Sequence, residues 1–166
     1  MTAPSDDPAF EAKLVAASKI LVPAAAGLGA GVAGMAATAA VLALLRSPGA
    51  AWSDDSRLVG LLTALSLAGN LAAGFAADIL WKARLRAAAP RCADALTAAF
   101  VLRVVPREAA AMLGGVAAVL GAQSGLLRAR PVYWLSLAPA ALFLNFLREV
   151  WPSPRNLRDE LEKIVR

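Results

Sequence analysis

The stretch ILVPAAAGLGAGVAGMAATAAVLALL, residues 20–45, decides the fold of this chain because it contains 26 residues and no charged side chain. An α-helix rises about 1.5 Å per residue and the hydrocarbon core of a bilayer is roughly 30 Å thick, so about 20 apolar residues can cross it. The rest of the chain is similar, since 59% of its 166 residues are hydrophobic and only 17% are charged. So few polar residues could not cover the surface of a soluble domain, and we expect an integral membrane protein.

Three more runs without charge follow, at residues 58–77, 109–127 and 131–147. Each is long enough to cross the bilayer as a helix, the last if Arg148 snorkels or the helix continues to Trp151. The sequence therefore predicts an all-α fold, a single membrane domain over residues 1–166 with four transmembrane helices at 20–45, 58–80, 109–127 and 131–151.

The ends of the chain are predicted to form amphipathic helices. Asp7 followed by Pro8 is a good helix start, so residues 1–19 should lead into the first span. After Pro152 the apolar residues of the tail, 152–166, recur at helical spacing, which gives this segment one apolar face for a membrane surface or a partner.

The segment 82–108 is ambiguous. Its apolar part is too short to cross a bilayer, and Arg103 and Arg107 fall on the same helical face as Leu96 and Phe100. We expect a helix on the inner membrane surface with its arginines at the lipid headgroups, while a re-entrant or buried segment is the alternative.

Basic residues lie mostly at one side of the predicted spans, thirteen against four if both termini are inside. The inner thirteen are Lys13, Lys19, Lys82, Arg84, Arg86, Arg91, Arg103, Arg107, Arg148, Arg155, Arg158, Lys163 and Arg166, and the outer four are Arg46, Arg57, Arg128 and Arg130. The positive-inside rule then predicts that both termini lie inside, in a bacterial plasma membrane or an organelle membrane. The net charge of +5 favours anionic lipids at the inner basic segment as partners, and no nucleic acid.

A glycine pattern, Gly29-Ala30-Gly31-Val32-Ala33-Gly34, matches the GxGxxG motif of dinucleotide-binding loops. Such a loop needs a preceding strand and an acidic residue about 20 residues later, whereas these glycines lie inside one apolar run. Small residues four apart instead favour close packing of membrane helices. The predicted helix-packing residues are Gly27, Gly31, Gly34, Gly121 and Gly125.

Polar residues of the second span form one stripe. Thr63, Ser66, Asn70, Gly74 and Asp78 lie within about a third of the helical circumference, so they should face protein or water rather than lipid. Asn70 and Asp78 are therefore candidates for a polar pathway that binds a solute or cation. The alternative is structural hydrogen bonding between helices, with Asp78 paired to Lys82.

Catalytic groups are scarce. The chain has no histidine, one cysteine, no nucleophile elbow and no phosphate loop, and no single span carries a pair of carboxylates. We expect no enzyme activity, no cofactor and no metal.

Two stretches resemble the peroxin family that elongates peroxisomal membranes before division. NLAAGFAADILWKARL, residues 70–85, is similar to that family's asparagine followed by an aspartate, a tryptophan and a basic residue. CADALTAAFVLRVVPREAAAMLGGVAAVLGAQSGLL, residues 92–127, is similar to its apolar helix, its proline with a basic neighbour and its glycine-containing membrane segment. The resemblance implies a membrane-shaping protein.

Three functions are therefore to be weighed. The first is a non-catalytic accessory subunit of a larger membrane complex, which docks to other membrane subunits through its predicted helix-packing glycines. The others are a peroxin-like membrane-shaping protein and a small solute or ion carrier.

Overall fold

The computed structural model describes residues 8–46, 54–87 and 93–165. This part of the chain is all-α and contains six α-helices and one 3-10 helix. The elements are α1 (Pro8–Leu45), α2 (Asp54–Ala87), α3 (Ala93–Gln123), α4 (Leu126–Ala129), η2 (Pro131–Leu137), α5 (Ala138–Glu149) and α6 (Pro154–Val165).

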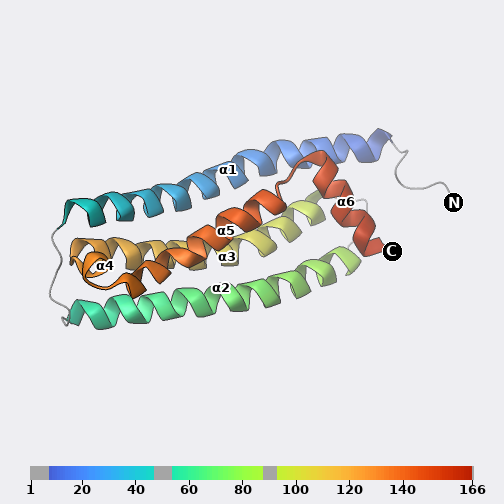
Figure 1. Cartoon of the computed structure of the whole chain (residues 1–166). Coiled ribbons are helices and arrows are strands. Elements are labelled where there is room, and N and C mark those ends of the chain that lie inside the picture. Colours follow the sequence, from blue (N-terminus) through green and yellow to red (C-terminus); the bar gives the residue numbers. More distant parts are fainter. Residues whose placement is uncertain (1–7, 47–53, 88–92, 166) are drawn as a thin grey trace.

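Helix α3 is the centre of the bundle. Both α1 and α2 pack along it, as do α5 and η2, whereas α1 and α2 make no extensive contact with each other. Figure 1 shows α1 and α2 on opposite sides of the layer formed by α3 and α5, with the N-terminus and α6 at the same end. The hydrophobic core joins side chains such as Leu21, Val104 and Phe143 from three of these helices.

Among the residues that the structure describes, three helices are long and apolar enough to cross a membrane: Pro8–Leu45, Ser56–Ala83 and Leu96–Gln123. Their outer surfaces carry large apolar side chains, including Leu44, Leu71 and Phe75, of which Phe75 is 76% exposed. In water such exposure would be unfavourable, whereas lipid tails accommodate it. The described part of the chain therefore has the character of a membrane protein, as its composition predicted.

The predicted surface helix at 82–108 is not a separate element. Residues up to Ala87 continue α2, and residues from Ala93 onward continue without a break into the predicted third span. Pro106 lies inside α3 and does not end it. Neighbouring helices supply partners for Arg103 and Arg107, so these arginines need not lie at the lipid headgroups. Residues 88–92 lie outside the described part, and the position of the segment at the membrane surface stays a prediction.

The predicted fourth span, 131–151, is present as two shorter pieces, the 3-10 helix η2 and the α-helix α5. It is not one of the three helices that meet the length and apolarity of a membrane span. The change of helix type occurs where α3 approaches closely. A Cβ on Gly114 would collide with the carbonyl oxygen of Ser136, and it would lie 2.6 Å from Oγ of Ser66.

Candidate functional site

Arg107 is a buried arginine in the part of α3 that is apolar enough to span a membrane. Its side chain is folded back over the turn that Pro106 interrupts, and its Nη1 donates to the carbonyl oxygen of Arg103 at 2.9 Å. Its Nη2 donates to the carbonyl oxygen of Gly74 in α2 at 3.1 Å. The guanidinium carbon lies 4.1 Å from the centroid of the Phe146 ring of α5. A charge within a membrane span requires such partners, and it is a candidate for a functional site.

Arg103 lies one turn before Arg107 in α3 and adds one more aromatic ring and one carboxylate to this group of contacts. Its guanidinium is 5.2 Å from the Trp81 ring of α2 and 5.5 Å from the Phe146 ring of α5. It also forms an ion pair with Glu160 of α6, with 3.3 Å between Nη1 and Oε2. We call Trp81, Arg103, Arg107, Phe146 and Glu160 the arginine–aromatic cluster. It connects the four helices α2, α3, α5 and α6.

A small cavity of about 90 Å³ adjoins this cluster where α6 crosses the end of the bundle. Trp81 and Arg103 line one side, and Asn156 and Glu160 of α6 line another. Nε1 of Trp81 is buried and finds no acceptor among the described residues. A buried donor without a partner costs free energy, and a cavity of this size can hold a water molecule that satisfies it.

The tail helix α6 is attached to the bundle by contacts of several kinds. Ser153 caps its first turn, because Oγ of Ser153 accepts from the backbone N–H of Asn156 at 3.2 Å. Leu157 is buried in the core, and Arg158 pairs with Glu11 of α1. Leu157, which belongs to the predicted apolar face of the tail, thus packs against the core of the bundle. The side chains that follow Glu160 lie outside the described residues.

The polar stripe of α2 faces the interior of the bundle. Ser66 is fully buried, and its Oγ donates to the carbonyl oxygen of Ala110 in α3 at 2.7 Å. Thr63 donates within its own helix, to the carbonyl oxygen of Val59 at 2.7 Å. The amide nitrogen of Asn70 is buried without an acceptor among the described residues. The side chain of Asp78 lies outside the described part, so its predicted pairing with Lys82 stays a prediction.

The predicted packing glycines of α1 point away from the bundle. A Cβ on Gly27, Gly31 or Gly34 would have no atom within 4 Å. The glycine of this helix that does pack is Gly29, where a Cβ would lie 3.0 Å from Cδ2 of Leu147 in α5.

The two predicted packing glycines near the end of α3 have different roles. A Cβ on Gly121 would lie 3.4 Å from Val59 and 3.5 Å from Leu127, so this glycine faces α2 and the turn after α3. Gly125 adopts a left-handed conformation with φ of 74°, which ends the helix and starts α4. The closest approaches to α3 are instead made at Gly114 and at Gly115, which contacts Met35 of α1.

The groups of the arginine–aromatic cluster are suited to binding polar and aromatic partners. An arginine stays protonated and cannot act as a base at neutral pH. Groups of three or more histidine, cysteine or acidic side chains that could hold a metal do not occur in residues 8–46, 54–87 and 93–165. The contacts of the arginine–aromatic cluster join α2, α3, α5 and α6.

The sequence analysis did not predict the contacts of Arg103 and Arg107 with other helices. Their spacing of four residues put them correctly on one face, but the span was taken to start after them. Aromatic side chains near the inner ends of two other predicted spans, Trp81 and Phe146, were the available signal, since arginine stacks on such rings.

Comparisons with protein-family models, with curated proteins and with solved structures find no match to this chain. Function must therefore be inferred from the sites described above.

Proposed function

We propose that this protein is a non-catalytic structural subunit of a larger membrane complex, and that α1 is the helix that docks to a neighbouring subunit. The observation that supports this proposal is the open glycine face of α1, which we define by Gly27, Gly31 and Gly34. Glycines on an outer helix surface let the backbone of another membrane helix come close, which strengthens van der Waals packing where no hydrophobic effect operates.

The bundle itself leaves this face uncovered. The buried side of α1 is formed by residues such as Leu21, Ala25 and Val32, and at 100° per residue it is centred more than 90° away from the glycines. Within the same protein, Gly114 and Gly115 are in close contact with other helices. On the open glycine face of α1, a Cβ at any of the three glycines would have no atom of the described residues within 4 Å, and this favours a helix of another protein as the occupant.

We further propose that η2 and α5 complete a fourth crossing, with both termini on the inner side. Seven residues of 3-10 helix rise about 14 Å and twelve residues of α-helix about 18 Å, which together match the thickness of the hydrocarbon core. The start of α1 and the helix α6 lie at the same end of the bundle (Figure 1), as four crossings require. The excess of basic residues on that side supports the inner placement.

Purification from native membranes tests the proposed function. A tagged chain extracted in mild detergent should migrate with other membrane polypeptides, which mass spectrometry identifies. Gly31→Leu should release them, because the new side chain occupies the docking face. Gly60→Leu is the matched control, since Gly60 of α2 also has no atom within 4 Å of a Cβ position.

Two results would contradict the docking proposal. The first is migration of the wild-type protein as a monomer without other polypeptides. The second is retention of the same polypeptides, to the same extent, by Gly31→Leu and Gly60→Leu.

A membrane-shaping activity is a second candidate, favoured by one observation. Trp81 and Arg103, which belong to the two stretches that resemble the peroxin family, are 22 positions apart in the sequence, yet the Arg103 guanidinium lies 5.2 Å from the Trp81 ring. If the protein shapes membranes, the purified chain should turn vesicles of phosphatidylethanolamine and phosphatidylglycerol into tubules visible by electron microscopy. Vesicles that remain spherical at high protein density would reject this candidate.

A further inference from the structure

A groove of about 410 Å³ runs between α1 and α5 on the surface of the bundle. Its α1 side is formed by small residues, among them Ala26, Gly29 and Ala30, and its α5 side includes Leu147. Gly29 lines the groove where α1 lies close to α5, since a Cβ there would lie 3.0 Å from Cδ2 of Leu147. The groove is therefore an open apolar channel, with small side chains on its α1 side, on a surface that we expect to face lipid.

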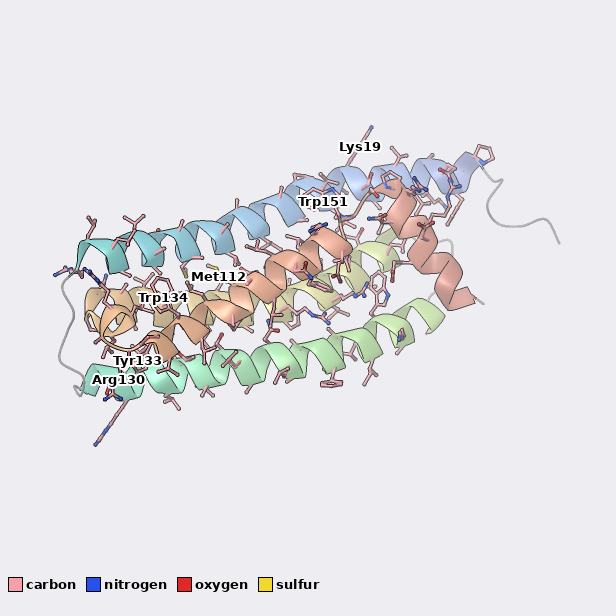
Figure 2. All side chains as sticks on the ribbon, viewed as in Figure 1. Lys19, Met112, Arg130, Tyr133, Trp134 and Trp151 are labelled. Atoms are coloured by element: carbon pink, nitrogen blue, oxygen red, sulfur yellow. The ribbon has the colours of Figure 1, made fainter. Side chains whose placement is uncertain are left out.

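Charged and aromatic residues lie toward the end of the groove that is nearer both termini. Arg148, in the last turn of α5, and Trp151 both line it. Arg148 is exposed and has no ion-pair partner among the described residues. Lys19 is exposed on the same face of α1 as Ala26, seven residues or about 10 Å toward that end. Figure 2 shows Lys19 projecting away from the helices, with Trp151 between α1 and the start of α6.

An apolar channel with cations at one end is complementary to a single kind of membrane component. Basic pockets between membrane helices on the inner side bind anionic lipid headgroups, and tryptophan prefers the level of the headgroups. Arg148 can reach toward this level because its long side chain is free to snorkel.

We propose that the groove between α1 and α5 binds one anionic glycerophospholipid. An acyl chain lies against Ala26, Gly29 and Ala30, and Arg148 binds the phosphate, with Lys19 adding to the positive potential. A zwitterionic lipid binds less well because its own ammonium group offsets the attraction of the cations. This site is distinct from the open glycine face, which lies further round α1, so either can fail without the other.

Mass spectrometry of the intact protein, released from detergent with added lipid, tests the site. Phosphatidylglycerol and phosphatidylcholine with identical acyl chains are titrated separately. We expect phosphatidylglycerol to bind more tightly, and Arg148→Gln to weaken its binding about fivefold, which corresponds to roughly 1 kcal/mol per basic residue. Binding of phosphatidylcholine should change little in this variant.

A second pair of variants tests the apolar channel. Ala30→Leu fills the groove and should weaken both lipids, whereas Ala37→Leu adds the same side chain on the same face beyond the groove and should have no effect. Both alanines are exposed, so neither change disturbs the core.

The proposal is overturned if phosphatidylglycerol and phosphatidylcholine bind equally, or if Arg148→Gln keeps the wild-type preference. Equal effects of Ala30→Leu and Ala37→Leu would also overturn it. If millimolar inorganic phosphate displaces phosphatidylglycerol completely, the site recognises a soluble phosphate and the lipid assignment is wrong.

Discussion

The contact between α3 and η2 can be tested by adding a single methyl group at Gly114. In Gly114→Ala the new Cβ would collide with the carbonyl oxygen of Ser136, which belongs to the backbone and cannot rotate away. It would also lie 2.6 Å from Oγ of Ser66, which donates to the carbonyl oxygen of Ala110. Either η2 moves outward or the hydroxyl leaves its acceptor, and both changes destabilise the bundle.

The expected magnitude follows from these contacts. Overpacking of a well-packed core costs about 1–3 kcal/mol. Loss of a hydrogen bond between membrane helices adds on the order of 0.6 kcal/mol. Replacing glycine by alanine inside a helix returns roughly 0.5–1 kcal/mol. We therefore expect Gly114→Ala to lower the free energy of unfolding by about 1–3 kcal/mol.

The matched control is Gly27→Ala, which adds the same methyl group where no atom lies within 4 Å. It should be neutral, or stabilise the protein by up to about 1 kcal/mol through helix propensity alone. Unfolding by titration of a denaturing detergent into mild-detergent micelles, followed by circular dichroism, measures the difference. Equal stability of the two variants would refute the close approach of η2 to α3.

Three further predictions concern the cluster, the tail and the orientation. Phe146→Ala removes the ring under both arginines and should lower the free energy of unfolding by about 3 kcal/mol in the same assay. The control Phe75→Ala, at an exposed ring on the outer surface, should lower it by less than about 1 kcal/mol. Leu157→Asp places a charge in the core and should release α6, which limited proteolysis detects as faster cleavage of the tail; an unchanged cleavage rate would mean that the core does not hold this helix. With the native cysteine replaced by serine, Arg130→Cys and Arg155→Cys should be labelled by an impermeant thiol reagent from opposite sides of the membrane, and labelling from the same side would reject four crossings.

The long apolar helices were predictable because the absence of charge over 20 or more residues is a local property of the sequence. The orientation of α1 about its axis was not, whereas the polar stripe of α2 indicated the side of that helix that faces the bundle. Helix α1 is apolar on every side, so its composition does not distinguish the buried Val32 from the outward Gly31. Which glycine of the pattern packs inward, Gly29, depends on Leu147 more than a hundred residues later.

The arginine–aromatic cluster could not be predicted for a related reason. A buried guanidinium is tolerated when acceptors and rings surround it, and the partners of Arg107 are supplied by the backbone of Gly74 and by Phe146. These partners are defined by the packing of three helices rather than by neighbouring residues. Sequence analysis alone therefore placed Arg107 where an isolated helix would have placed it, at the headgroups.

The central position of α3 has a consequence for the biosynthesis of this protein. Helices α1 and α2 leave the ribosome first, but each finds its principal partner in α3 and neither packs extensively on the other. Since membrane helices insert as independent units before they associate, we expect the first half of the chain to remain in the bilayer as two separate helices until α3 follows. Assembly begins only when α3 has been inserted, and a chain truncated before Ala93 has no core around which to fold.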